Sequence, residues 1–180
     1  MSPTCLHATC QPSPSSSLTV GLRTLRHGDQ ASLLEIFTGL GDRSRELRFL
    51  TPKPRLTPAD LRQLTAVDHH DHVALLAVTA DERPIGVARF VRDPREPDIA
   101  DVAVAVVDDW HGRGVGTLLA SALTERALHV GVRRFSMVMR PDNEAAVRLL
   151  HRAPGKVSRV SIDSEAAEFV LHLEQDGRKR

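Results

Sequence analysis

The stretch Trp110–Leu119, WHGRGVGTLL, decides the fold because it joins two different sequence patterns. Residues 100–107, ADVAVAVV, form an apolar run typical of a buried strand, and residues 116–131, GTLLASALTERALHVG, repeat leucine and alanine at helical spacing. Three glycines stand at alternate positions between the strand and the helix. A glycine loop that opens a helix presents unpaired N–H groups at the positive end of the helix dipole. The stretch therefore predicts a site for a phosphate or pyrophosphate group.

The glycine spacing argues against two common nucleotide-binding loops. A P-loop carries a lysine directly after its last glycine, and Thr117 stands at that position. A dinucleotide-binding loop has the pattern G-x-G-x-x-G, with an acidic residue about 20 positions further on. The corresponding region here carries Arg133 and Arg134. The alternative is a tight turn without a ligand, which would need the φ freedom of glycine at only one position. Because three glycines are present, we favour ligand binding.

Length and composition indicate one folded domain of balanced charge. The chain has 180 residues, with 24 lysines and arginines against 23 aspartates and glutamates, so charge gives no argument for nucleic acid or for a membrane surface. No apolar run approaches the ~20 residues that span a bilayer. Residues 1–17 are rich in proline and serine and are expected to be disordered, with Cys5 and Cys10 as free thiols. We expect the folded domain over residues 18–175, a basic tail over 176–180 and a cytoplasmic location.

The remaining patterns predict the order β, α, α, β, β, β, α, β, α, β, β, a mixed sheet covered by helices. Asp29 and Asn143 or Asp142 are candidate helix caps, and Thr57 with Asp60 forms a capping-box pattern. Besides the two segments already quoted, the expected strands are residues 18–25, 72–80, 85–92, 134–139, 156–162 and 167–173, and the expected helices are 29–40, 44–50, 56–64 and 143–152.

Three other groups of residues have structural interpretations. The segment VDHHDH, residues 67–72, contains histidine and aspartate but no partner cluster of matching spacing, so we expect a polar loop and no metal site. Arg89 and Arg92 are expected on the polar face of a strand, with contact to a substrate as an open alternative. Met137 and Met139 are expected in the core or in the wall of a cavity.

The segment VAVAVVDDWHGRGVGTLLASAL, residues 102–123, resembles motif A of the GNAT acetyltransferases, [RQ]-x-x-G-x-[GA] after an apolar strand. His111 replaces the usual glutamine or arginine. NEAAVRLLHR, residues 143–152, similarly resembles motif B. Residues 64–78 and 88–110 are similar to the acetyltransferase domain of actinobacterial protein lysine acetyltransferases. Some of these carry a cyclic-nucleotide-binding domain; residues 1–17 are too short for one, so we expect no regulation of that kind.

The resemblance implies the GNAT fold, with a mostly antiparallel sheet of about seven strands flanked by about four helices, and a binding site for acetyl-CoA in a V-shaped opening between strands 100–107 and 134–139. It implies Asp101 as the general base, with Asp98 and Glu96 as substitutes. Leu150 stands where many GNAT enzymes place a tyrosine acid, and the chain has no tyrosine. The implied acetyl-CoA contacts are Val104, Val106, Val107, His111, Gly112, Arg113, Gly114, Val115, Gly116, Thr117 and Asn143.

The expected function is therefore direct transfer of an acetyl group from acetyl-CoA to an amine. The narrower resemblance implies that the acceptor is the ε-amino group of a protein lysine. Two alternatives stay open: an acetyltransferase for a small-molecule amine, and a non-catalytic regulatory module that binds acyl-CoA. We expect a monomer or homodimer that binds no nucleic acid, no membrane and no metal.

Overall fold

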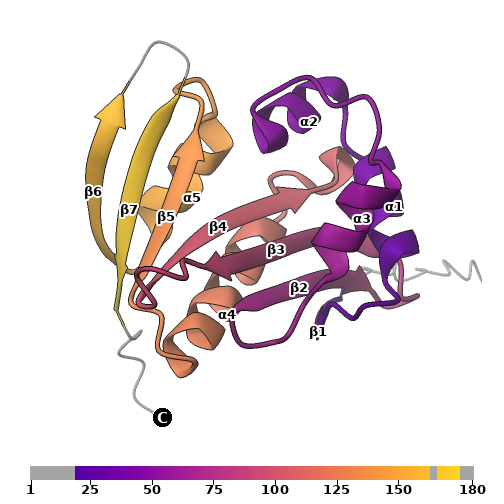
Figure 1. Cartoon of the computed structure of the whole chain (residues 1–180). Helices are drawn as coiled ribbons and strands as arrows, with labels where there is room; N and C mark the ends of the chain where they lie inside the picture. The colour runs from indigo at the N-terminus through magenta and orange to yellow at the C-terminus, as the bar shows by residue number, and fades with distance from the viewer. Residues whose placement is uncertain (1–18, 163–165, 175–180) are drawn as a thin grey trace, which may run out of the picture.

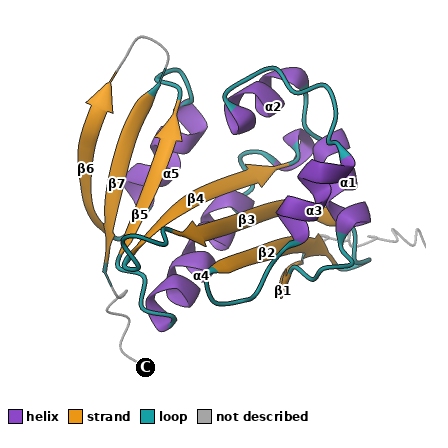
Figure 2. Cartoon of the chain, in the orientation of Figure 1, coloured by secondary structure: helices purple, strands orange, loops and turns teal. Residues whose placement is uncertain are grey.

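The computed structural model describes residues 19–162 and 166–174, which form one seven-stranded sheet with helices on both faces (Figures 1 and 2). The tails predicted over residues 1–17 and 176–180 lie outside the described residues. The elements are β1 Val20–Thr24, α1 Gln30–Thr38, α2 Asp42–Phe49, α3 Pro58–Thr65, β2 His72–Thr79, β3 Pro84–Arg92, β4 Ile99–Val106, the 3-10 helix η1 Asp108–Trp110, α4 Val115–His129, β5 Arg134–Met139, α5 Glu144–Arg152, β6 Gly155–Ile162 and β7 Ala167–Leu173.

The predicted strands and helices are present, but the predicted order had two helices before the second strand and the structure has three, α1, α2 and α3. The described residues thus form five α-helices where the family resemblance implied about four. The strands lie in the order β1-β2-β3-β4-β5-β7-β6. All neighbouring pairs are antiparallel except β4 and β5, which are parallel. A parallel connection needs a crossover, and α4 supplies it.

The parallel pair is short, and this shapes the centre of the molecule. Pairing joins only Ile99–Asp101 of β4 to Arg134–Ser136 of β5. Beyond these residues the two strands diverge, as Figure 1 shows. The predicted V-shaped opening is therefore present in the fold.

Two faces of the sheet can be distinguished by the alternation of side chains along β3. A Cβ atom at Gly86 would lie 3.1 Å from Leu119 Cδ1, so Gly86 points toward α4; we call this side the α4 face. Val87 and Arg89 point the other way and line a small cavity with Leu33 of α1; we call that side the α1 face. In Figure 2, α4 and α5 lie behind the sheet and α1 and α3 in front of it.

The core lies chiefly between the sheet and α4, whose apolar residues follow helical spacing as predicted. Leu119 and Leu123 are fully buried, as are Phe90 and Val73 of the sheet. Met139 is buried and Met137 is partly buried against this core, in line with their predicted place. No helix in the described part of the chain is long and apolar enough to cross a membrane.

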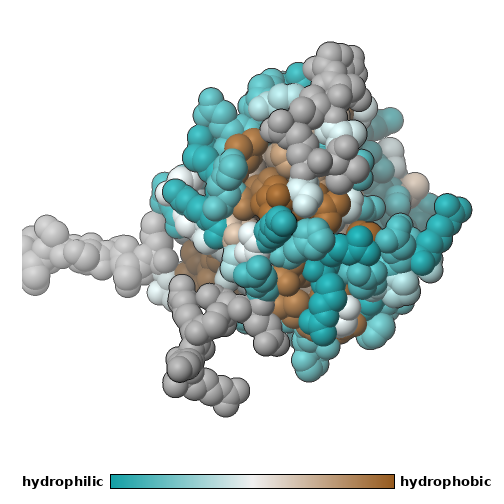
Figure 3. Space-filling model, turned by 90° about the vertical axis from the view of Figure 1, so that its left-hand side faces the viewer, coloured by the Kyte–Doolittle hydropathy of each residue, from teal (hydrophilic) through white to brown (hydrophobic). Residues whose placement is uncertain are grey.

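The far edge of the sheet is β6. Figure 3 views the molecule from that side and shows hydrophobic surface at the middle of the face, bordered by hydrophilic residues. Val157 of β6 and Val138 of β5 are 36% and 50% exposed. The expected monomer or homodimer stays a prediction.

The predicted helix caps have different outcomes. Asn143 caps α5, its side chain accepting a hydrogen bond from the Ala146 N–H at 3.1 Å. Asp29 occupies the N-cap position of α1 without making a side-chain cap bond. Its carboxylate accepts two hydrogen bonds from the Arg23 guanidinium, at 2.7 and 3.0 Å. The guanidinium thus engages both carboxylate oxygens, which explains why the side chain does not cap the helix.

The capping box of α3 is present as predicted, and it yields a stability prediction. The Thr57 hydroxyl accepts from the Asp60 N–H at 3.2 Å, and the Asp60 carboxylate accepts from the Thr57 N–H at 2.7 Å. We expect Thr57→Ala to lower the free energy of unfolding by about 1 kcal/mol. Urea denaturation measures this change, and Thr51→Ala, in a nearby loop, is the control. Equal midpoints for the two variants would contradict the prediction.

The prediction that Arg89 and Arg92 lie on a polar strand face is wrong. Arg89 is only 7% exposed and contacts the His72 ring. The Arg92 side chain is 11% exposed, pairs with Asp71 at 2.7 Å and donates to the Val130 carbonyl at 2.6 Å. Both faces of the sheet are covered at its centre, so the alternation of side chains along a strand does not indicate which of them are exposed there.

Residues 67–71 form the predicted loop, and His72, the last residue of the segment, begins β2. The Asp68 carboxylate accepts three backbone hydrogen bonds at 2.8 Å, from His70, Asp71 and His72. The His70 ring contacts the Asp71 carboxylate at 2.7 Å. Over the described ranges, no group of three histidines, cysteines, aspartates or glutamates is placed to hold a metal ion.

Candidate acetyl-CoA site

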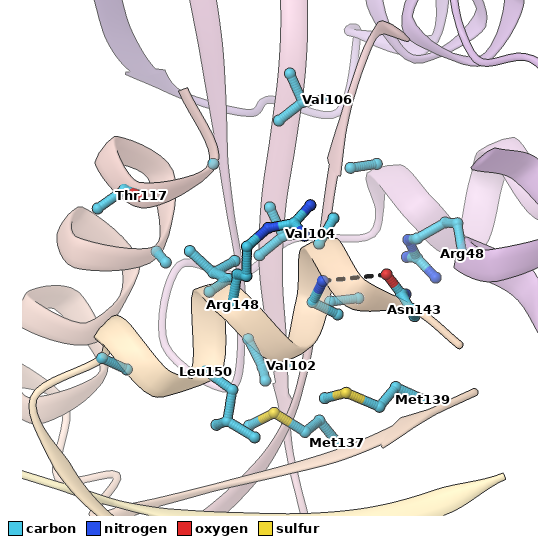
Figure 4. A pocket seen from close by; sticks show the side chains of 18 of the residues that line it. Arg48, Val102, Val104, Val106, Thr117, Met137, Met139, Asn143, Arg148 and Leu150 are labelled. Atoms are coloured by element: carbon cyan, nitrogen blue, oxygen red, sulfur yellow. Dashed lines mark hydrogen bonds between the residues drawn. The ribbon is translucent and has the colours of Figure 1, made fainter. Parts of the chain in front are cut away.

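A cavity of about 440 Å³ lies where β4 and β5 diverge. Its walls come from β4, β5, the start of α4, α5 and one side of α2. Figure 4 shows Val104 and Val106 on one side, Met137 and Leu150 on another, and Asn143 beside the cavity. The cavity therefore lies between residues 102–123 and 143–152, the two segments that resemble motifs A and B.

The backbone of β4 is unpaired along one edge of this cavity. Val107 N–H donates to the Ile85 carbonyl at 3.0 Å, toward β3, and Asp98 C=O accepts from Arg134 N–H at 2.9 Å, toward β5. Because peptide groups alternate in direction along a strand, the even-numbered residues of β4 direct N–H and C=O toward β5. Pairing with β5 stops at Asp101. Val104 and the N–H of Val106 therefore face the cavity unpaired, whereas the Val106 carbonyl contacts the His111 ring and the Val107 N–H bonds to Ile85.

The glycine loop adopts the conformation that only glycine adopts readily. Gly112 and Gly114 have φ of 72° and 83°. Gly114 is the N-cap residue of α4, and no side chain caps the helix there. The first N–H groups of a 15-residue helix are thus left open beside the cavity. This end of the helix suits an anion.

Gly116 differs from the other two glycines because its backbone is ordinary helix. A Cβ atom there would meet only Val106 Cγ2, at 3.9 Å, which is an ordinary contact. We expect Gly116→Ala to leave the melting temperature unchanged or slightly higher, since alanine favours helix by up to ~1 kcal/mol. We expect it to weaken CoA binding about tenfold, because the added methyl keeps a pyrophosphate from the backbone.

Calorimetric titration with CoA, alongside a thermal melt, measures both effects of Gly116→Ala. A variant that binds CoA as tightly as the wild type would show that this glycine has no role in binding. Loss of thermal stability would show that the fold itself needs it. Ser121→Ala, at an exposed position on the same helix, is the control for handling and purity.

Two loop side chains that we predicted to contact acetyl-CoA have partners within the protein. The His111 ring is 2.8 Å from the Val106 carbonyl oxygen, so it fastens the loop to the end of β4. The Arg113 guanidinium lies 5.1 Å from the centre of the Trp110 ring and is not among the groups that line the cavity. The other predicted contacts that line the cavity are Val104, Val106, Gly112, Gly114, Val115, Gly116, Thr117 and Asn143.

Three arginines line the cavity, and sequence reasoning missed all of them: Arg48, Arg148 and Arg152. Arg148 and Arg152 are four residues apart on α5, a spacing that puts both on one helix face and that was visible in the sequence. Arg48 comes from α2, far away in sequence, and carried no such signal. Within the described lining there is no aspartate or glutamate, so arginine supplies the positive charge of the cavity wall, although Arg148 also pairs with Glu144 at 3.0 Å.

Ion pairs hold α2 at the cavity. Arg140, which follows β5, contacts Glu46 of α2 at 3.3 Å, and Asp142 pairs with Arg43 of α2. Asp142 has its pKa lowered by the hydrogen bonds from Arg140 and Arg43. These contacts connect the β5 side of the opening to the helix that carries Arg48.

Asp101 lies near the point where β4 and β5 separate. It pairs with Val91 of β3, so its side chain shares the α1 face. The side chain is exposed and makes no ion pair or hydrogen bond with any residue that the structure describes. The substitutes Asp98 and Glu96 are engaged instead, by Arg134, at 2.9 and 3.1 Å. Asp101 is thus the free carboxylate of the three.

The position expected for a general acid holds Leu150, which is buried and lines the cavity (Figure 4). Among the described lining residues there is no cysteine, aspartate or glutamate. A thiol has a pKa of about 8.5, so a thiolate leaves readily near neutral pH without an acid.

A mixed sheet that splays at one parallel pair, with a glycine loop at the start of the crossover helix, defines the GNAT class of fold. The acetyltransferase (GNAT) family matches residues 42–154, which is more than half of the chain. The chain belongs to this family.

The comparisons with individual proteins agree with the family. Acetyltransferase Pat of Mycolicibacterium smegmatis is 39% identical over 97 residues, which are 53% of this chain and 29% of Pat. The GNAT domain of S. lividans PAT is 26% identical, with a TM-score of 0.78 over 84% of this chain and 89% of that one. The Salmonella typhimurium protein yncA, solved with acetyl-CoA, has the same fold at 18% identity, with a TM-score of 0.67 over 88% and 96% of the two chains.

Proposed function

We propose that the protein transfers the acetyl group of acetyl-CoA to an amine, within one domain over residues 18–175. The observation that carries the proposal is the cavity at the splayed strands, lined by Arg148 and Arg152 of α5 and by the open N-terminus of α4. Acetyl-CoA is the thioester of CoA, and its CoA part carries several negatively charged phosphates, which are the groups that such a lining attracts. Family membership supports the same ligand.

The proposed reaction is a direct attack. The amine nitrogen bonds to the thioester carbonyl carbon, the carbon–sulfur bond breaks, and CoA leaves as a thiolate. Asp101 accepts the proton that the amine loses, directly or through one water. The peptide groups of Val104 and Val106 hold the pantetheine arm, and the α4 N-terminus holds the pyrophosphate. The thiolate takes its proton from solvent, which requires no acid at Leu150.

The acceptor we propose is the ε-amino group of a protein lysine. The support is the 39% identity with Pat and the likeness to the PAT domain. This chain matches only 29% of Pat, so the acceptor is inferred from the shared part alone. We place the reaction in the cytoplasm, consistent with a chain whose only cysteines are Cys5 and Cys10.

One assay tests the proposal. The protein is incubated with acetyl-CoA and either small amines or lysine-bearing proteins, and release of CoA thiol is followed together with the mass of the acceptor. We expect acetylated lysine on proteins. Acetylation of small amines alone would favour the small-molecule alternative. Tight CoA binding without thiol release with any acceptor would favour the regulatory module.

A further inference from the structure

Two arginines on the α1 face, Arg48 and Arg89, have no acidic partner among the residues that the structure describes. Arg89 of β3 is 7% exposed, donates to the Leu64 carbonyl at 3.2 Å and contacts the His72 ring. Arg48 of α2 makes no hydrogen bond; its guanidinium lies 5.0 Å from the centre of the Phe49 ring. In contrast, Arg23, Arg43, Arg45, Arg83, Arg92, Arg134, Arg140 and Arg148 each pair with a carboxylate.

The two charges lie close enough to affect each other. Burial, with a smaller contribution from the Arg48 charge, lowers the pKa of Arg89 to about 10. Burial also lowers the pKa of Arg48. Arg89 therefore stays protonated at neutral pH, and so does Arg48, because an arginine side chain does not lose its proton in proteins. Burial and the Arg89 charge lower the pKa of His72, so His72 adds no third charge at neutral pH.

Like charges that are removed from water without a counter-ion destabilise a fold. A buried arginine is usually stabilised by pairing with a carboxylate, as the largely buried Arg92 is with Asp71. An unpaired pair beside a ligand cavity points to an anion supplied from outside the chain.

The position of the pair relates it to the acceptor rather than to the phosphates of CoA. Arg89 is paired with Ala103, and Asp101 with Val91, so Arg89 and Asp101 are diagonal neighbours on the α1 face. Side chains in that relation are about 7–8 Å apart at their bases. The glycine loop follows the other end of β4. The register thus places Arg89 diagonally across from the proposed base, while its guanidinium contacts Leu64 and His72.

Arg48 links this place to the acetyl-CoA cavity. It lines both the large cavity and a small one of about 30 Å³ that Arg89 also lines. Figure 4 shows Arg48 reaching toward the cavity from α2, with Asn143 close to it in the view. The small cavity has room for about one water molecule, and both arginines belong to its lining.

We propose that Arg48 and Arg89 bind a carboxylate that the acceptor carries near its reacting amine. The inference rests on the proposed function, since it assumes that an amine reaches Asp101. A guanidinium donates two parallel hydrogen bonds to a carboxylate, which fixes the orientation of the group it holds. Two sources share this chemistry: an aspartate or glutamate beside a protein lysine, and the α-carboxylate of an amino acid.

The test compares acceptors that differ only in one carboxylate. One arm uses lysine peptides with glutamate or glutamine next to the lysine, and the other uses amino acids and their carboxamides. We expect the wild type to prefer the carboxylate form by about tenfold in kcat/KM in one arm. The arm that shows the preference identifies the source. Equal use of both forms in both arms would overturn the proposal.

Arg48→Gln should reduce that preference to near unity, and Arg89→Lys should reduce it by a smaller factor. The ratio of the two forms cancels any change in acetyl-CoA binding, which matters because Arg48 lines the cavity. Arg62→Gln, at an exposed position on α3, is the control and should keep the full preference. An undiminished preference in Arg48→Gln would contradict the assignment.

A binding measurement separates this inference from the proposed function. The ¹⁵Nε–H signal of Arg48, identified by its loss in Arg48→Lys, is followed during titration with sodium acetate and, at equal ionic strength, with sodium chloride. We expect acetate alone to shift it. A shift without acetylation of any acceptor would contradict the proposed function and leave the carboxylate site standing. No shift would overturn the carboxylate site whatever the activity.

Discussion

Asp101→Asn is expected to lower kcat/KM for acetyl transfer by ~100-fold or more at neutral pH, because general-base catalysis contributes about that much. Asparagine keeps the size of the side chain and removes its basicity. Asp101 is exposed and has no hydrogen-bond or ion-pair partner among the described residues, so the substitution breaks no contact of the fold. The affinity for CoA and the melting temperature should both stay at wild-type values.

The pH profile distinguishes a base from a carboxylate that only attracts the acceptor. A lysine amine has a pKa of about 10.4, so a rising pH supplies the free amine without help from the enzyme. The deficit of Asp101→Asn should therefore shrink as pH rises toward 10. Glu125→Gln, which removes an exposed carboxylate on α4, is the matched control. Full activity of Asp101→Asn across the pH range would exclude Asp101 as the base.

The sequence predicted those parts of the fold that a local pattern of residues determines. Alternation and apolar runs predicted the seven strands, and the change to helical spacing after Gly114 predicted α4. The divergence of β4 and β5 came from the family resemblance, because no local pattern states where a pairing stops. Asp29 shows the limit of local rules: its capping role was displaced by Arg23, a partner on the preceding strand.

The parts of the candidate site that backbone groups form could be predicted from the sequence. The loop glycines were found from their spacing, since positive φ and an open helix N-terminus follow from local sequence. Arg48 and Arg89 were missed or misplaced because their environment depends on α2 and β3 packing across the same face of the sheet. Arg89 looked like an exposed strand charge and is buried. Tertiary contacts of this kind leave no periodic signal in a single sequence.

Gly114→Asp is expected to raise the Kd for CoA by ~100-fold or more, through two effects at one position. Gly114 has φ of 83°, where a side chain is strained, and it caps α4. An aspartate there also places a negative charge where the proposed pyrophosphate lies. A Cβ atom at this position meets nothing within 4 Å, so the substitution causes no clash inside the protein.

Gly131→Asp separates the two effects because it reproduces the strain without the site. Gly131 has φ of 90°, equally open space around a Cβ atom, and a position just after the other end of α4. Both variants should lose thermal stability, since a left-handed conformation costs a non-glycine residue about 1–2 kcal/mol, and Gly131→Asp should lose more because its charge lies at the negative end of the α4 dipole. Only Gly114→Asp should lose CoA binding in calorimetric titration. If both variants bind CoA with equal affinity, a negative charge at position 114 has no more effect on binding than one at position 131. The loop then does not hold the phosphates.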